Sequence, residues 1–355
     1  MKILFVATVG RHFYHFHLPV FRMLRDAGWQ VDAAARMDKP LPPGCADGLF
    51  DLPFERSPYH PANIKAYGQL RKVMRLGKYD LIHCHTPVGG LAGRLAARGT
   101  GAKLLYTAHG FHFYQGAPPL HWLLYYPLER WLSRRTDCLI TINEEDYAFA
   151  RRKLKAKQVA RVHGVGCETS KFIPARAKQT ETPALIYIAE LNANKNQELL
   201  LRAMSTILAR FPGARLRLVG PDHFNGAYQR LSRDLRIAHA VEFTGERQDI
   251  PALLAESDLA VASSLREGLP VNVMEAMAAS LPVVASDNRG HRELVRSGLT
   301  GDIVPPGDVA GFAEAVIQLL EDPARRAEMG AAGRERCREY ALERVLAELR
   351  EVYGL

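Results

Sequence analysis

The chain has 355 residues, of which 47% are hydrophobic and 24% charged, and a formal net charge of +9. This length suits two domains, and the composition is that of an ordinary globular protein. Five scattered cysteines without a Cys-x-x-Cys pair argue against a disulfide framework and a structural zinc site. No apolar run approaches the roughly 18 residues that span a bilayer, and the N-terminus is more typical of a strand than of a signal peptide.

The positive charge is concentrated in the first half. Residues 1–165 carry 24 Lys and Arg against 12 Asp and Glu, whereas residues 166–355 carry 23 against 26. A basic half indicates an anionic partner. Because no nucleic-acid-binding motif is present, we expect an anionic membrane surface and no nucleic acid.

Apolar strands and helical segments alternate through the first half, beginning with a strand at residues 2–8 and a helix at 18–27. Further strands are expected at residues 30–35, 79–84, 103–108 and 137–142. This alternation predicts a mainly parallel sheet covered by helices. In the third strand, His83 and His85 would share one face and Cys84 the other, which favours packing over a metal site.

An aromatic-rich segment, residues 119–132, precedes Arg134-Arg135. As a helix it either lies in a membrane interface or packs under the first sheet, and the sequence leaves both open. The basic segment 151–157 adds to the same positive half. Together these features favour a cytoplasmic protein that is peripheral on the inner face of the membrane.

A polar stretch, residues 176–183, is the predicted linker, and the alternation of strands and helices begins again after it. Strands are expected at residues 185–189, 215–219, 241–244, 259–262 and 282–285, and helices at 197–210 and 342–353. The predicted fold is α/β with two doubly wound, Rossmann-like domains, residues 1–168 and 183–335, facing across a cleft. Residues 336–355 are expected to form a helix that returns to the first domain.

The most informative motif, residues 266–275, places two glutamates eight positions apart between two predicted strands. A glycine and a proline break the loop, and a helix is expected to begin near Val271. Glu275 would then lie roughly 6 Å further along the helix axis, while Glu267 stays in the loop. Free N–H groups at the helix start favour an anion between the two carboxylates. Such an arrangement suits a nucleotide sugar.

These features resemble glycosyltransferase family 4, which has the GT-B fold, and especially its bacterial capsular and exopolysaccharide branch. The resemblance extends over essentially the whole chain. Besides the two-glutamate element, it is carried by Phe16-His17-Leu18-Pro19, His109-Gly110-Phe111-His112-Phe113-Tyr114, Thr141-Ile142-Asn143-Glu144-Glu145-Asp146 and Glu190-Leu191-Asn192-Ala193-Asn194-Lys195-Asn196.

The resemblance implies two catalytic residues, His109 and Glu267. His109 would reach over the donor sugar, and Glu267 would bind a sugar hydroxyl and stabilise positive charge near the anomeric carbon. Glu275 would bind the ribose, and Lys195 would neutralise the diphosphate. The other donor contacts would come from the loop at Gly10 and from amides near Gly268, Leu269 and Val271. The roles of His17 and His112 stay open.

One position departs from the family pattern. Glu190 stands where many relatives have an arginine that joins Lys195 on the diphosphate. Either Lys195 works with helix dipoles alone, or another cation substitutes, the candidates being Arg11, Arg266 and Arg289. Because no Asp-x-Asp pair occurs, we expect no metal and no cofactor beyond the UDP-sugar substrate.

The sequence thus predicts a retaining hexosyltransferase that moves a hexose or N-acetylhexosamine from a UDP-sugar to a lipid-diphosphate-linked saccharide. The expected setting is capsule, exopolysaccharide or O-antigen synthesis, and retention is implied by the resemblance alone. An epimerase or hydrolase on the same fold is the alternative, and it would consume the nucleotide sugar without an acceptor. A non-enzymatic partner subunit is a third hypothesis, against which the intact Glu267, Glu275 and His109 argue.

Overall fold

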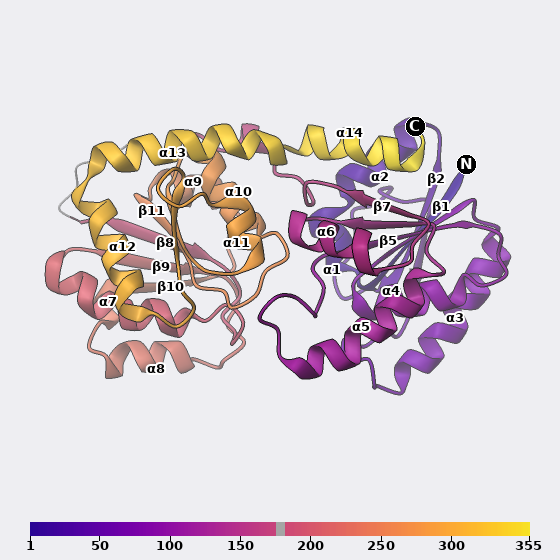
Figure 1. The fold of residues 1–355 in the computed structure, drawn as a ribbon, viewed down its shortest axis with the longest axis horizontal. Coiled ribbons are helices and arrows are strands. Elements are labelled where there is room, and N and C mark those ends of the chain that lie inside the picture. Colours follow the sequence, from indigo (N-terminus) through magenta and orange to yellow (C-terminus); the bar gives the residue numbers. More distant parts are fainter. Residues whose placement is uncertain (175–181) are drawn as a thin grey trace. The chain divides into compact units, whose positions relative to one another are not determined.

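A computed structural model describes residues 1–174 and 182–355. The described chain forms two compact units: unit 1 is Met1–Val165 with Val345–Leu355, and unit 2 is Gly166–Arg344. Each unit has its own parallel sheet with helices packed on it (Figure 1). Most of the predicted linker, residues 176–183, lies outside the described residues. The last helical residues belong to unit 1 although they follow unit 2 in the sequence.

Unit 1 contains a seven-stranded sheet in the order β3-β2-β1-β4-β5-β6-β7. Its strands are β1 (Lys2–Val9), β2 (Gln30–Arg36), β3 (Gly48–Asp51), β4 (Leu81–His85), β5 (Lys103–Ala108), β6 (Cys138–Thr141) and β7 (Gln158–Arg161). Its helices are α1 (Arg11–Phe16), α2 (Leu18–Asp26), α3 (Ala62–Gly77), α4 (Pro87–Ala96), α5 (Pro119–Ser133) and α6 (Glu144–Lys153), joined by most of α14 (Leu342–Tyr353).

Unit 2 contains a six-stranded sheet in the order β10-β9-β8-β11-β12-β13. Its strands are β8 (Ala184–Ile188), β9 (Arg215–Val219), β10 (Val241–Gly245), β11 (Leu259–Ala262), β12 (Val283–Ser286) and β13 (Gly301–Val304). Its helices are α7 (Gln197–Arg210), α8 (Ala227–Asp234), α9 (Ile250–Ala255), α10 (Val271–Ala278), α11 (Arg289–Leu294), α12 (Val309–Glu321) and α13 (Pro323–Cys337), with short 3-10 turns at Thr169–Lys171, Ala238–Ala240 and Arg338–Tyr340.

Both sheets confirm the predicted doubly wound α/β fold. Every strand pairing within them is parallel, and the central strands are buried along their whole length, which requires helices on both faces. In each sheet the strand order reverses once, between β1 and β4 and between β8 and β11. Ligands of such sheets bind beyond the carboxyl ends of the strands at this reversal.

The face assigned to the histidines of β4 is also confirmed. Cys84 is buried in one hydrophobic cluster, with Leu4 and Val6, on one side of the sheet. His83 points to the other side, where its Nδ1 lies 2.8 Å from the Tyr353 hydroxyl of α14. Strand alternation alone places the two side chains on opposite faces.

Helix α5 is attached to unit 1 by a buried ion pair. Arg94 of α4 is 2% exposed, and its guanidinium forms a two-pronged contact with Glu129 of α5, with Nη2 to Oε2 at 2.9 Å. The same guanidinium stacks on the Tyr106 ring of β5, 3.8 Å from its centroid, and its Nε donates to the Gly90 carbonyl. Groups of unit 1 therefore compensate the buried charge of Arg94.

Replacing Glu129 with Gln should destabilise unit 1 by about 3–5 kcal/mol, because it leaves the Arg94 charge buried without its partner. All three tryptophans, Trp29, Trp122 and Trp131, lie in unit 1, so urea unfolding followed by tryptophan fluorescence reports on this unit. The matched control is Glu55→Gln, which removes an exposed pair with Arg36 and should cost less than about 1 kcal/mol. Equal midpoints for the two variants would contradict this account.

Candidate nucleotide-sugar site and histidine cluster

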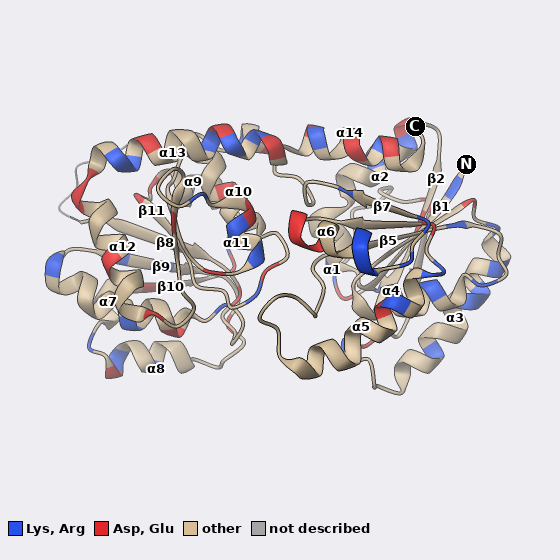
Figure 2. Cartoon of the chain, in the orientation of Figure 1, with Lys and Arg blue, Asp and Glu red and all other residues tan. Residues whose placement is uncertain are grey.

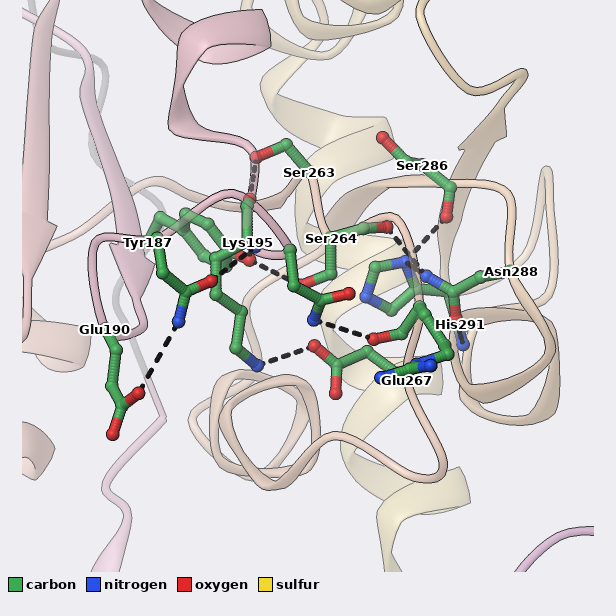
Figure 3. Close-up of polar contacts among 12 residues, drawn as sticks. Tyr187, Glu190, Lys195, Ser263, Ser264, Glu267, Ser286, Asn288 and His291 are labelled. Atoms are coloured by element: carbon green, nitrogen blue, oxygen red, sulfur yellow. Dashed lines mark hydrogen bonds and ion pairs between the residues drawn. The ribbon is translucent and has the colours of Figure 1, made fainter. Parts of the chain in front are cut away.

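In unit 2, three loops at the carboxyl ends of β8, β11 and β12 are joined by hydrogen bonds. Asn194 donates from Nδ2 to the Arg266 carbonyl at 3.0 Å, and the Leu265 amide donates back to the Asn194 carbonyl at 2.8 Å. Asn288, after β12, donates from Nδ2 to the Ser264 carbonyl at 2.9 Å. These contacts fix the loops that carry Lys195 and Glu267 relative to each other (Figure 3).

Lys195 and Glu267 form the centre of the site. The Lys195 ammonium Nζ lies 2.6 Å from Oε1 of Glu267, and the Glu267 side chain is 14% exposed. Burial would raise the pKa of Glu267, but the charge of Lys195, together with hydrogen bonds from Lys195 and Ser264, holds that pKa below its usual value. Glu267 is therefore a carboxylate at neutral pH. The sequence predicted both residues for the donor site, and the structure brings them into contact.

Helix α10 begins at Val271, as the sequence predicted, with Pro270 in an extended conformation at its N-cap. The first amides of the helix have no acceptor within it, so they are available to an anion. Glu275 lies one turn further along, and burial raises its pKa to about 7, with only a small opposing effect from Lys171. The two glutamates of the motif thus have pKa values shifted in opposite directions.

His291 of α11 belongs to this site and was missed by sequence reasoning. Its Nδ1 is 2.6 Å from the Ser286 carbonyl and 2.9 Å from Nδ2 of Asn288; a hydrogen bond to the carbonyl places the proton on Nδ1 and makes Nε2 an acceptor. That Nε2 is buried without a hydrogen-bond partner among the described residues. Burial lowers the pKa of His291, so the ring is neutral beside the ion pair. The sequence offered one signal for this residue, a polar run directly after the strand predicted at residues 282–285.

Gly290 allows the Glu267 loop to lie against α11. A Cβ atom added at Gly290 would come within 2.8 Å of the Glu267 Cβ and 3.0 Å of the Pro270 Cδ. These distances leave no room for any side chain. The position of the catalytic candidate therefore depends on a glycine two elements away in the sequence.

The structure separates Glu190 from the ion pair. A Glu190 carboxylate oxygen lies 3.6 Å from Nε2 of His223. Lys195, by contrast, reaches Glu267 and not Glu190 (Figure 3). Among the cations that could replace the missing arginine, Arg289 is 5% exposed and donates from Nε to the Glu267 carbonyl at 3.3 Å. Arg11 belongs to unit 1, where it pairs with Asp38 at 2.5 Å. Arg289 therefore contacts the Glu267 loop, and Arg266 is itself part of that loop, where its carbonyl accepts from Asn194.

The remaining predicted residues, Gly10 and His109, lie in unit 1. The Gly10 amide donates to the Arg36 carbonyl at 2.7 Å, so its N–H is already used within unit 1. Nε2 of His109 lies 3.2 Å from Nδ1 of His85. Burial lowers the pKa of His109 to about 4. Their roles toward the donor stay predictions.

His109 is one of four histidines that converge beyond the carboxyl ends of β1, β4 and β5. The others are His12 of α1, His17 between α1 and α2, and His85 at the end of β4. Burial lowers the pKa of His17 to about 3 and holds those of His12 and His85 well below the usual value. The sequence did not group these residues, because they come from three separate segments.

Two family models together match almost the whole chain. A glycosyl transferase 4-like domain matches residues 18–167, and the glycosyl transferases group 1 family matches residues 168–336. A protein named for glycosyltransferase activity, EpsD of Bacillus subtilis (strain 168), is 44% identical over 99% of this chain and 96% of its own length. The UDP-Gal:alpha-D-GlcNAc-diphosphoundecaprenol alpha-1,3-galactosyltransferase of Escherichia coli is 27% identical over 73% of this chain and 71% of its own.

Among solved structures, Anabaena HepE in complex with UDP and glucose has the same fold. It covers all of this chain and 99% of its own, with a TM-score of 0.81 and 20% identity. The chain belongs to the GT-B glycosyltransferases, in the bacterial exopolysaccharide branch, and is a transferase. The predicted family and fold are thereby confirmed.

Glu275→Gln should stabilise the protein at pH 8 and not at pH 4. A carboxyl whose pKa is about 7 when folded and 4.5 when unfolded makes stability fall as pH rises from 4.5 to 7. Glutamine carries no such charge, so the gain at pH 8 should be on the order of 1–3 kcal/mol. Urea unfolding followed by circular dichroism measures it, with Glu198→Gln on the exposed face of α7 as control. Parallel pH profiles of wild type and variant would contradict the assignment.

Proposed function

We propose that this protein is a retaining, metal-independent hexosyltransferase. It moves a hexose or N-acetylhexosamine from a UDP-sugar to a lipid-diphosphate-linked saccharide during capsule, exopolysaccharide or O-antigen synthesis. The observation that carries the proposal is the contact between Lys195 and Glu267, 2.6 Å apart, beside the start of α10.

This contact fits the electrostatic demand of sugar transfer. Breaking the sugar–phosphate bond puts negative charge on the departing diphosphate and positive charge on the sugar ring, so the site needs a cation at one end and a carboxylate at the other. In the free protein the two groups satisfy each other. When the donor enters, Lys195 would exchange Glu267 for the diphosphate, and Glu267 would exchange Lys195 for a sugar hydroxyl. No metal is required for this exchange.

The nucleotide end of the donor would lie along α10. The amides of Val271 and its neighbours would bind the phosphates, as would those near Gly268 and Leu269, and Glu275 would accept hydrogen bonds from the ribose hydroxyls. Such donors favour the carboxylate, so binding should release a proton from Glu275 near pH 7. His109 and the Gly10 loop of unit 1 are proposed as the further contributors to the donor.

The names of similar proteins support the same donor and acceptor classes. The Escherichia coli relative is named for transfer from UDP-Gal to a diphosphoundecaprenol-linked sugar, and HepE has been solved with UDP and glucose. An acceptor of that kind is anchored in a lipid bilayer, so this enzyme would work at a membrane surface.

Helix α5 offers a surface for that membrane. Its inner face, with Trp122 and Tyr126, packs on the core of unit 1, as one of the two alternatives for this segment expects. The outer face is apolar at helical spacing, with exposed fractions of 58% at Leu120, 71% at Leu123 and 45% at Leu124, and it continues through Leu128 and Trp131. Arg130, Arg134 and Arg135 lie at its C-terminal end, whereas the rest of the face carries no charge (Figure 2). Exposed leucines beside arginines suit an anionic bilayer interface.

In the described part of the chain, no helix combines the length and apolar character needed to cross a membrane. Contact with lipid would therefore depend on surfaces such as the outer face of α5.

Glu267→Gln should reduce sugar transfer by about 10²–10³-fold while UDP still binds, because it removes the charge that stabilises the transition state. Lys195→Ala should weaken UDP binding by about 10–100-fold through loss of a charge-assisted contact. Calorimetry with UDP and single-turnover transfer assays separate the two effects. Arg202→Ala on the exposed face of α7 is the control. Wild-type transfer by Glu267→Gln would refute the site.

The alternative function, an epimerase or hydrolase, is tested with a UDP-sugar alone. A transferase should leave the donor intact until a lipid-linked acceptor is added. Conversion of the donor at the same rate without acceptor would favour the alternative. Binding of UDP without any turnover, with every acceptor offered, would favour the non-enzymatic subunit.

The double variant Leu123→Ser/Leu124→Ser should lower partitioning onto phosphatidylglycerol vesicles by at least about 10-fold, because burying each leucine contributes roughly 1.5–3 kcal/mol. Vesicle co-sedimentation measures it. The control is Ile64→Ser/Leu76→Ser on α3, where the exposed fractions are 76% and 72%. Binding of the wild type should also fall with added salt. Equal partitioning of both variants would show that α5 is not the contact.

A further inference from the structure

The histidine cluster of unit 1 has the composition of a metal site. His12, His17, His85 and His109 each offer a ring nitrogen, and these four atoms lie within 4.8 Å of one another. The rings approach closely, with centroids 4.2 Å apart for His17 and His85 and 4.7 Å apart for His12 and His109. They come from three segments that meet where the strand order reverses, the position at which such sheets bind ligands.

Two nitrogens of the cluster lack any partner. Nε2 of His12 and Nε2 of His85 are buried and make no hydrogen bond within the described structure. The adjacent His83 is different, since its Nδ1 meets the Tyr353 hydroxyl and its Nε2 meets Thr107 Oγ1, both at 2.8 Å. Buried polar atoms in native proteins are satisfied by protein, water or an ion. Both ring nitrogens of His83 have protein partners, whereas Nε2 of His12 and Nε2 of His85 have none that the structure describes.

The absence of negative charge around the four described rings also favours a metal ion. Across residues 1–174 and 182–355, no carboxylate forms an ion pair or hydrogen bond with any of the four rings. No described group therefore compensates an imidazolium there. Neutral imidazole is the form that coordinates metal ions, and a set of nitrogens without carboxylates suits zinc better than magnesium or calcium.

We propose that His12, His17, His85 and His109 bind one zinc ion in unit 1. Tetrahedral zinc with Zn–N near 2.0–2.1 Å requires ligand atoms about 3.3 Å apart. With Nδ1 of His85 and Nε2 of His109 as ligand atoms, 3.2 Å apart in the free protein, the more distant rings would move inward to complete the site, and the partnerless Nε2 of His12 is the nitrogen that the zinc would satisfy. Phe5 stacks on the His85 ring and lies edge-on to His17, and Phe21 lies tilted against His17, so two apolar rings border the cluster.

This proposal departs from the expectations from the sequence that the chain holds no metal and no structural zinc site, and it changes the interpretation of one motif. Packing was favoured over a metal site for His83-Cys84-His85, and His83 and Cys84 remain packing residues, but His85 becomes a ligand through partners elsewhere in the chain. The proposal does not place metal on the donor diphosphate, and it stands whether or not the proposed transferase function is correct. A bound metal would fix the ring of His109 through one nitrogen and leave the other free.

The test uses the full chain purified without a histidine tag. After treatment with a chelator and removal of the chelator, the protein is titrated with zinc against a chromophoric competitor and with cobalt as a spectroscopic probe. We expect one zinc per chain, a visible cobalt absorption of tetrahedral intensity, and a rise in melting temperature with zinc. Failure of the wild type to retain zinc or to give a cobalt spectrum would overturn the proposal.

Variants identify the ligands. His85→Asn should weaken zinc binding at least 100-fold and abolish the cobalt spectrum. Because His85 is buried and this variant could lose its fold, His12→Asn at the half-exposed edge of the cluster is the second test, checked by circular dichroism. His121→Asn on α5 is the matched control and should bind zinc as the wild type does. Zinc retained at wild-type affinity by a folded His12→Asn variant together with a folded His85→Asn variant would refute the assignment.

Discussion

Parallel pairing forces the carboxyl ends of neighbouring strands to the same edge of a sheet, and both candidate sites depend on this constraint. In each unit the strand order reverses once, and the loops on either side of that reversal leave in opposite directions. The gap that results is filled by loop residues rather than by a crossover helix. Unit 2 places Lys195 and Glu267 there, and unit 1 places its four histidines there.

Within unit 2 the same motif prepares two carboxylates for different tasks. Glu267 is kept ionised by an ammonium group in direct contact, whereas burial leaves Glu275 partly protonated near neutral pH. A charged residue suits the reacting end of the donor, where positive charge develops. A carboxyl that gains its charge only when hydroxyl groups arrive suits the nucleotide end. Eight residues of sequence thus separate two carboxyl groups whose pKa values are shifted in opposite directions.

The sequence predicted the elements whose local signals are strong. Helix α10 begins at Val271 as expected, because a glycine and a proline end the preceding loop, and α7 and β5 also match their predicted bounds. The strands β3, β7 and β13 were not predicted. Each has four residues and is only partly buried at an edge of its sheet, so it lacks the apolar run that identifies a central strand.

The site was predictable to the same extent. Glu267 and Glu275 stand in a motif marked by spacing and strand context, and Lys195 was identified through the family resemblance. His291 and the histidine cluster could not, because their significance lies in which segments the fold brings together. A short contact between Nε2 of His109 and Nδ1 of His85 joins residues 24 positions apart on neighbouring strands, and no periodicity in the sequence marks it.

The buried pair between Arg94 and Glu129 has a consequence for the outer face of α5. A free amphipathic helix in water can rotate about its axis and turn its leucines away from the solvent. Here the carboxylate is bound from two sides by a guanidinium that is itself stacked on Tyr106, so rotation would strand a charge in the core. The leucines are consequently held outward even in the absence of lipid. The enzyme therefore has a permanently exposed apolar surface. Self-association through that helix should limit its concentration in storage and crystallisation unless a mild detergent covers the leucines.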